Sequence, residues 1–153
     1  MGNPIVRKAV QRDLLFLIPM SRRFVEESSL PFTFDVDATT FYLTSMMESE
    51  SAIVLVEEDD GIITGGILGL VDRDFCRESF AYVIKMFVEV EFRGLGTSRV
   101  LVEAFQDEAK RLGASIIFAS AAAGMGDRVE KLYVRLFEHY GFVTLGHMLY
   151  KEI

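Results

Sequence analysis

The sequence predicts a single α/β domain, built on a mixed β-sheet with helices on both faces. The chain has 153 residues, of which 50% are hydrophobic and 25% charged, and this balance is ordinary for a soluble globular protein. Its length corresponds to about one domain. Short apolar runs of strand length alternate with longer amphipathic segments, and no repeat or Pro/Gly/Ser-rich linker divides them. We therefore expect one domain over residues 1–153.

The first half of the chain is expected to form a strand, two helices and a β-hairpin. The predicted elements are a strand at 5–10, a helix at 13–28 that Pro19 kinks or splits, a second helix capped by Asp37, and strands at 52–56 and 62–71. Aspartate is a favourable N-cap because its carboxylate accepts hydrogen bonds from the first helical amides. The Asp60-Gly61 pair between the last two strands is a strong hairpin signal. Gly65 and Gly66 predict a bulge or a close backbone approach.

The second half is expected to add four strands and two helices. The predicted elements are a strand at 80–90, a helix from the turn at 93–98 to Leu112, a compact central strand at 115–119, a helix from a capping box at Asp127 to Gly141, and closing strands at 142–145 and 147–151. Gly113 is the expected C-cap of the first of these helices, because glycine adopts the left-handed conformation without strain. Alternation places Tyr82, Ile84, Met86 and Val88 on one face of the strand at 80–90.

Charge and composition argue against several classes of function. Lysine and arginine number 16 and aspartate and glutamate 23, and the net charge of −7 disfavours a nucleic-acid partner and suits a cationic one. The only cysteine, Cys76, closes no internal disulfide, which fits a reducing cytoplasm. His139 and His147 lack the spacing of a zinc site. The apolar run at 14–18 is too short to span a bilayer. We expect a cytoplasmic protein with no metal and no membrane attachment.

The most informative stretch is a strand that runs into glycines and then a helix, Val88-Glu89-Val90-Glu91-Phe92-Arg93-Gly94-Leu95-Gly96-Thr97-Ser98. Gly94 and Gly96 have no Cβ and let a ligand approach the main chain. The first amides of the helix are unpaired, and the helix dipole makes this end positive. The turn therefore predicts a pyrophosphate site. The alternative is a strand-to-helix turn that needs glycine for its geometry alone.

This stretch resembles the signature of the GNAT superfamily of N-acyltransferases, in which an apolar strand is followed by Arg/Gln-x-x-Gly-x-Gly/Ala. Arg93 and Gly96 match the pattern, whereas Ser98 stands where glycine or alanine is usual and Val90 where proline is common. The resemblance extends over nearly the whole chain, and the segment 28–32 looks like the linker of small bacterial and phage-encoded members. It implies a mixed, mostly antiparallel central sheet of about six to seven strands with helices on both faces.

The resemblance further implies that acetyl-CoA is the acyl donor. The pantetheine arm would pair with the main chain of the strand, because an unpaired strand edge offers amides and carbonyls as a neighbouring strand would. The pyrophosphate would lie on the glycine turn. The residues implied in cofactor binding are Met86, Phe87 and Val88 for the arm and Arg93, Gly94, Leu95, Gly96, Thr97 and Ser98 for the pyrophosphate. The Val88 amide is the expected donor to the thioester oxygen.

Tyr133 is the candidate catalytic residue. Family members place a tyrosine proton donor on the last helix, four residues before Gly-Phe, and counting back from Gly141 that position holds Phe137. Counting forward from Asp127 the tyrosine is Tyr133, and the two counts differ by about one helical turn. A tyrosine of pKa about 10 is a sufficient acid for a departing thiolate. The alternative is that Tyr133 is a core residue. No general base is assigned, because Tyr82 occupies the position of the family's strand glutamate.

We therefore expect an N-acetyltransferase in which a primary amine attacks acetyl-CoA directly in a ternary complex. The acceptor is a small molecule or a peptide, and a homodimer is an open question. One alternative is a non-catalytic acyl-CoA-binding or protein-interaction domain of the same fold, which Phe137 and the missing strand glutamate favour. Another is a protein whose glycine turn binds no nucleotide. The acidic turn at 57–60 is either an attractant for a cationic substrate or a solvated hairpin tip.

Overall fold

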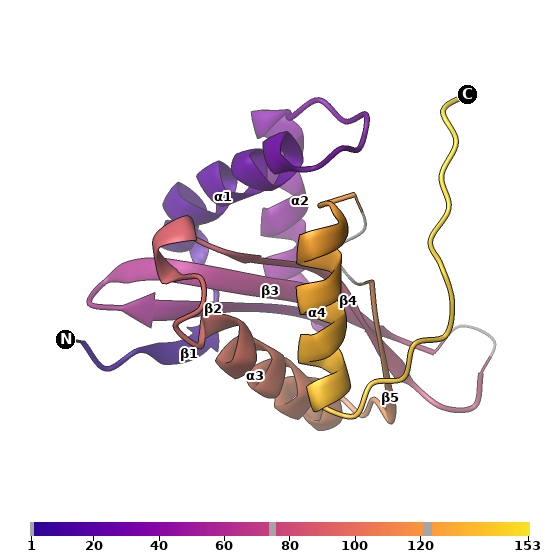
Figure 1. The fold of residues 1–153 in the computed structure, drawn as a ribbon. Helices are drawn as coiled ribbons and strands as arrows, with labels where there is room; N and C mark the ends of the chain where they lie inside the picture. The colour runs from indigo at the N-terminus through magenta and orange to yellow at the C-terminus, as the bar shows by residue number, and fades with distance from the viewer. Residues whose placement is uncertain (1, 74–75, 121–123) are drawn as a thin grey trace.

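The structure is a computed structural model and describes residues 2–73, 76–120 and 124–153. One mixed sheet has the strand order β1-β2-β3-β4-β5, with all neighbours antiparallel except the parallel pair β4 and β5. Helices α1 and α2 pack on one face and α3 and α4 on the other, as predicted (Figure 1). The strands are β1 (Ile5–Lys8), β2 (Ala52–Asp59), β3 (Ile62–Asp72), β4 (Phe80–Val88) and β5 (Ile116–Ala119). The helices are α1 (Leu14–Glu27), α2 (Val36–Glu48), α3 (Thr97–Arg111) and α4 (Asp127–His139).

The sheet has five strands in the described part of the chain, fewer than the six or seven predicted. The expected strands at 142–145 and 147–151 do not form, and Val143, Leu145 and Leu149 are exposed. A strand gains its backbone hydrogen bonds from a neighbour, and Figure 1 shows this terminal segment (yellow) running up the outside of the molecule without joining the sheet. Consequently β5 is an edge strand of the sheet and not the central strand that its apolar sequence predicted.

The hairpin between β2 and β3 forms as predicted. Asp60 and Gly61 have φ angles of 50° and 81°, the positive values of a two-residue type I′ turn. The predicted irregularity at Gly65 and Gly66 is a bulge one residue earlier, because Thr64 is left unpaired where the register shifts. A Cβ on Gly65 would also lie 2.9 Å from the first side chain of α3. The start of α3 therefore packs directly on the sheet at this point.

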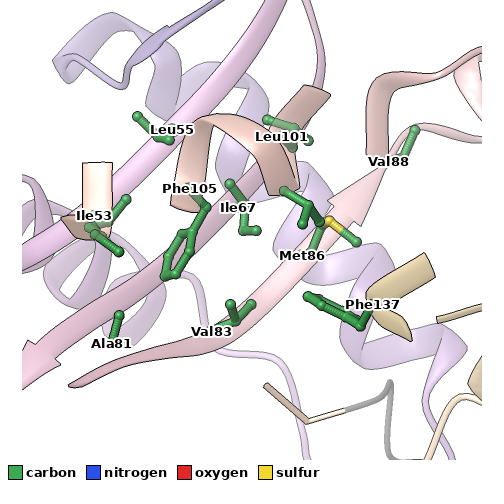
Figure 2. Close-up of a cluster of buried hydrophobic side chains, with 12 residues drawn as sticks. Ile53, Leu55, Ile67, Ala81, Val83, Met86, Val88, Leu101, Phe105 and Phe137 are labelled. Carbon is green, nitrogen blue, oxygen red and sulfur yellow. The ribbon is translucent and has the colours of Figure 1, made fainter. Parts of the chain in front are cut away.

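A second bulge redirects β4, the strand that carries most of the predicted site. The register against β3 shifts so that Ile84 is an extra residue. The prediction that Tyr82, Ile84, Met86 and Val88 share one face is therefore wrong, because one extra residue exchanges the two faces of the strand beyond it. The buried β4 side chains on the α3 face are Ala81, Val83, Met86 and Val88 (Figure 2).

Most helix ends follow local sequence signals. Helix α1 continues through Pro19 without a break. The N-cap of α2 is Asp35, whose carboxylate accepts an amide of the first turn at 2.7 Å, and not the predicted Asp37, which lies inside that turn. Gly113 ends α3 with a φ of 92°, as predicted. The predicted capping box at Asp127 is wrong, because this residue is already helical and the glycine before it is the N-cap.

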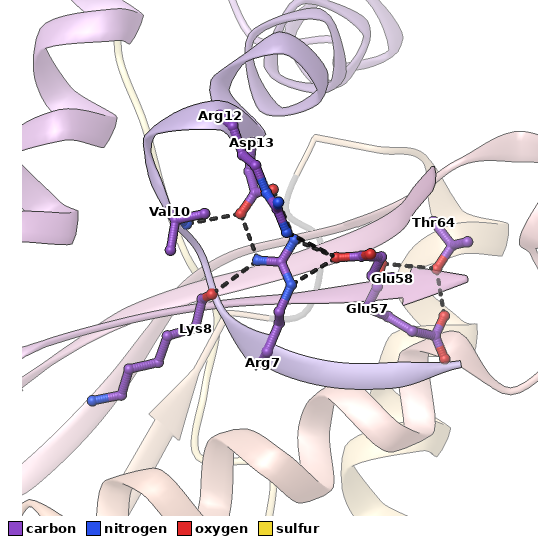
Figure 3. A network of polar contacts seen from close by, with 8 residues as sticks. All are labelled: Arg7, Lys8, Val10, Arg12, Asp13, Glu57, Glu58 and Thr64. Atoms are coloured by element: carbon purple, nitrogen blue, oxygen red, sulfur yellow. Dashed lines mark hydrogen bonds and ion pairs between the residues drawn. The ribbon is translucent and has the colours of Figure 1, made fainter. Parts of the chain in front are cut away.

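A partly buried ion-pair network ties β1 to the start of α1 and to β2 (Figure 3). The two Nη atoms of Arg7 donate to the two carboxylate oxygens of Asp13 at 2.7 and 2.9 Å, and Nε donates to Glu58 at 2.7 Å. The Val10 amide also donates to Asp13, which is 2% exposed. Burial raises the pKa of Asp13, but these hydrogen bonds outweigh burial and hold the pKa below its usual value.

We predict that Asp13→Asn destabilises the protein by about 3 kcal/mol, because the neutral amide removes the more buried of the two carboxylates that pair with Arg7 and leaves only Glu58. Urea denaturation at pH 7 measures the loss. Since the pKa of Asp13 is lower in the folded than in the unfolded chain, its contribution is present above the unfolded value of about 4 and is lost as the pH falls through the folded value. The difference in unfolding free energy between Asp13→Asn and the wild-type protein should therefore become smaller at acidic pH. The control is Arg111→Gln, which breaks an exposed ion pair with Glu108 and should change stability little; equal losses in the two variants would contradict the prediction.

Candidate functional site

Among the residues that the structure describes, none continues the pairing of β5 along the edge of β4, and we call this stretch the open edge of β4. The two strands pair from Phe80 to Val83 of β4, and β5 ends at Ala119. Farther along, the Tyr133 hydroxyl donates to the Met86 carbonyl at 2.9 Å, and Arg93 Nε donates to the Val88 carbonyl at 2.9 Å. The N–H and C=O of one strand residue point to the same edge, and alternate residues share that edge. The amides of Met86 and Val88 therefore face the same side as these carbonyls.

A cavity of about 850 Å³ lies along this open edge. It brings together β4, the glycine turn, the end of α1 and the inner face of α4. Nearly all the residues predicted to form the site line it, and they are Met86, Phe87, Val88, Arg93, Gly94, Leu95, Gly96, Ser98 and Tyr133. The exception is Thr97, which is 4% exposed because its side chain packs on the sheet next to Gly65.

The glycine turn requires glycine for its backbone conformation. Gly94 and Gly96 have φ angles of 82° and 102°, which strain other residues. A Cβ built on either glycine reaches no atom within 4 Å, so the space above the turn is open. Helix α3, 15 residues long, starts directly after Gly96 and carries no side-chain cap at its N-terminus. The first-turn amides and the helix dipole are therefore available to an anion in the cavity.

Tyr133 combines a packed ring with a hydroxyl at the open edge. Its ring lies 6.4 Å from that of Phe137, which is 5% exposed and belongs to the core (Figure 2). Burial raises the pKa of Tyr133 to about 12; the positive charge of Arg93 lowers this pKa and the negative charge of Glu27 raises it. The phenol is therefore protonated at neutral pH and is held at the Met86 carbonyl.

Arg93 connects the β4 edge to α1. Besides its bond to Val88, its Nη2 lies 3.0 and 3.2 Å from the two carboxylate oxygens of Glu27, and its guanidinium stands 5.2 Å from the centre of the Phe87 ring. Sequence reasoning missed Glu27, the last residue of α1. Nothing distinguishes Glu27 from the adjacent Glu26 in sequence, and only the three-dimensional structure places Glu27 at the cavity.

Other residues considered from sequence lie elsewhere. The acidic turn at 57–60 does not line the cavity, and only its end at Asp60 is an exposed tip: Glu57 is 6% exposed and accepts a hydrogen bond from Thr64, and Glu58 pairs with Arg7. Glu89 pairs with Arg23.

The histidine at the end of α4 and the lone cysteine were also considered from sequence. His139 is exposed but lines the cavity. Cys76 is exposed and is not part of the lining.

Among the described residues, no group of three or more His, Cys, Asp or Glu side chains is arranged to hold a metal ion. None of the helices found in those ranges has the length and apolar composition needed to cross a membrane.

The sequence matches the model of the acetyltransferase (GNAT) family over residues 21–142, which include the β4 edge, the glycine turn and Tyr133. The chain belongs to this family. The match confirms the resemblance drawn from the glycine turn. Comparison with curated proteins finds no match.

Solved structures share the fold of this GNAT chain over almost its whole length. An aminoglycoside N-acetyltransferase in complex with CoA has a TM-score of 0.81 at 12% identity, covering 100% of this chain and 96% of its own. A predicted acetyltransferase with acetyl-CoA from Clostridium acetobutylicum has a TM-score of 0.78 at 20% identity, covering 98% and 96%. Glucosamine-6-phosphate N-acetyltransferase from Arabidopsis thaliana has a TM-score of 0.75 at 15% identity, covering 98% of each chain. At sequence identities of 12% to 20%, these structural similarities show a shared fold.

We predict that the amides of Met86 and Val88 exchange with solvent faster than the amide of Phe87, because the first two face the cavity and the third faces β3. Amide hydrogen exchange followed by NMR measures the three rates in one sample. Val83 has the paired β5 beside it and serves as the reference for a slow amide in the same strand. Equal protection of Met86, Val88 and Phe87 would show that the β4 edge is not open.

Proposed function

We propose that this GNAT protein is an N-acetyltransferase that transfers an acetyl group from acetyl-CoA to a primary amine, and that residues 1–153 form one catalytic domain. The observation that carries the proposal is the placement of three features in one cavity of about 850 Å³. These features are the β4 edge that no described strand covers beyond Val83, the positive-φ glycine turn at the start of α3, and the Tyr133 hydroxyl.

The residues of the cavity fit the two polar parts of acetyl-CoA. The turn from Arg93 to Ser98 offers helix amides and a guanidinium to the pyrophosphate. The edge from Met86 to Val88 offers amides and carbonyls to the amide-bearing pantetheine arm, as a neighbouring strand would. The open space above Gly94 and Gly96 leaves room for phosphate oxygens. Two of the solved structures with this fold contain CoA or acetyl-CoA, which supports the same donor here.

The geometry supports direct transfer in a ternary complex. The donor supplies a thioester carbonyl carbon, at which a C–N bond to the amine forms and the C–S bond breaks. The Val88 amide faces the cavity and stabilises the negative charge that develops on the carbonyl oxygen. Tyr133 gives its proton to the departing sulfur. The nitrogen loses a proton, so the net transfer is from amine to thiol, and the pKa of about 12 means that Tyr133 recovers its proton readily.

The class of acceptor follows from the reaction and from the relatives. Structures with this fold include an aminoglycoside N-acetyltransferase and a glucosamine-6-phosphate N-acetyltransferase, both of which act on amines of small molecules. The net charge of −7 favours a cationic acceptor over an acidic one. We propose a small-molecule amine as the acceptor and the cytoplasm as the place of action.

The first prediction of this proposal concerns Gly96. Gly96→Glu should weaken CoA binding by at least about a hundredfold in calorimetry, because the new carboxylate occupies the helix N-terminus and repels the pyrophosphate. Gly113→Glu is the matched control, since Gly113 also has a positive φ and open space around it but does not line the cavity. Both variants should lose similar stability. Undiminished CoA affinity in Gly96→Glu would place the donor elsewhere.

The second prediction concerns Tyr133. Tyr133→Phe should lower kcat about a hundredfold with little change in the KM for acetyl-CoA, because it removes the proton donor and keeps the packed ring. Thiol release with an amine acceptor measures the rate. Tyr140→Phe is the control, because its hydroxyl bonds Glu103 and not the β4 edge. Wild-type turnover in Tyr133→Phe would eliminate the tyrosine as the acid. CoA binding without turnover in the wild-type protein would favour a non-catalytic acyl-CoA-binding domain.

A further inference from the structure

The cavity is lined by both acidic and basic side chains. Glu27 is the one carboxylate among the described lining residues, whereas the basic side chains there are Arg93, Arg99, Arg135 and His139. The basic residues come from α4 and from the glycine turn and the start of α3. They suit a donor that carries phosphates. A carboxylate repels phosphates, so apart from its ion pair with Arg93, donor binding gives Glu27 no role in the cavity.

The position of Glu27 in α1 favours a bound cation. Glu27 is the last residue of the helix, and the last turn of α1 contains no basic residue. The C-terminal end of a helix carries a partial negative charge, which adds to that of the carboxylate. This end of α1 is also held in place, because the Ser29 amide donates to the Gly124 carbonyl at 2.6 Å. The end of α1 that carries Glu27 is therefore tied to the segment that precedes α4.

Arg93 fixes Glu27 close to the reacting groups without saturating it. The same guanidinium bonds the Val88 carbonyl through Nε and the Glu27 carboxylate through Nη2, so one side chain joins Glu27 to the open edge. A carboxylate has about four acceptor positions, and both contacts with Arg93 use one nitrogen. Glu27 retains acceptor capacity for N–H groups of a second cation. Its charge also acts on Tyr133, as expected if it lies near the proton donor.

We propose that Glu27 binds an ammonium group of the acceptor, so that the enzyme selects amines that carry a second positive charge. This inference rests on the proposed acetyltransferase function. The amine that attacks the thioester must be neutral, whereas the group that Glu27 binds is charged. A substrate that satisfies both is a diamine, a polyamine or an aminosugar with several amines. Glu27 thus acts as a specificity residue of the acceptor site.

The test compares two acceptors that differ only in the second ammonium group, hexane-1,6-diamine and hexylamine. With saturating acetyl-CoA, the wild-type protein should show at least a tenfold higher kcat/KM for the diamine. Glu27→Gln should remove most of this preference by raising the KM for the diamine about tenfold, the effect of losing one charge-assisted hydrogen bond, with hexylamine changed less than about twofold. Glu27→Asp should retain most of the preference because it keeps the charge.

Two controls separate acceptor binding from other roles of Glu27. Glu26→Gln changes the neighbouring glutamate, which is exposed and does not line the cavity, and it should leave both amines unaffected. CoA affinity, measured by calorimetry, should be the same within about twofold in the wild-type protein and Glu27→Gln. If Glu27→Gln weakened CoA binding as much as it raised the KM for the diamine, Glu27 would act through Arg93 on the donor, and the inference would be wrong.

The remaining outcomes are also decisive. Equal use of the two amines by the wild-type protein, or an unchanged preference in Glu27→Gln, would overturn the role of Glu27. If CoA binds but neither amine is acetylated, calorimetry measures the binding of hexane-1,6-diamine to the CoA complex. Absence of diamine binding in that measurement would also overturn the role of Glu27. Failure of the wild-type protein to bind CoA would instead refute the proposed function itself.

Discussion

The site depends on the separation of β4 from β5 beyond Val83. The extra residue Ile84 redirects the strand, and β5 ends before it can pair with the rest of β4. Backbone polar groups left without a ladder partner are costly unless something else bonds them. Here the hydroxyl of Tyr133 and the guanidinium of Arg93 bond two of the exposed carbonyls. The two side chains that stabilise the open edge, Tyr133 and Arg93, are therefore also part of the proposed site.

Arg93 connects the two parts of the proposed donor site, the glycine turn and the open edge of β4. It begins the glycine turn, yet its side chain reaches back to Val88 and across to Glu27 while it stacks on Phe87. The guanidinium remains charged at any pH the protein meets and has several donors in a rigid plane. A single residue can thus hold the turn, the strand edge and α1 in one arrangement. This is a structural reason for an arginine three residues before Gly96, beyond its charge.

The parts of the fold that were predicted correctly have local signals. The Asp60-Gly61 hairpin, the glycine turn before α3 and the C-cap at Gly113 each depend on a few adjacent residues whose backbone angles are restricted. Two local predictions were displaced, because the N-caps of α2 and α4 are Asp35 and Gly126 and not the predicted Asp37 and Asp127. The larger errors involve contacts between distant segments. The face exchange at Ile84 depends on the register against β3, and the missing strands at 142–151 depend on whether a neighbour pairs with them. Glu27 was missed for the same reason, because only the packing of α1 against the cavity distinguishes it from Glu26.

The sequence left two interpretations of Tyr133, a core residue or a proton donor, and the structure shows that they are compatible. A tyrosine packed against Phe137 must find a partner for its hydroxyl, because an unbonded buried hydroxyl is costly. That partner is the Met86 carbonyl, on the edge where the thioester arm would bind. A carbonyl oxygen has two lone pairs, so Met86 has acceptor capacity for Tyr133 and for an amide of the arm. Packing thus fixes the ring, the backbone orients the hydroxyl, and the raised pKa keeps the phenol protonated at neutral pH.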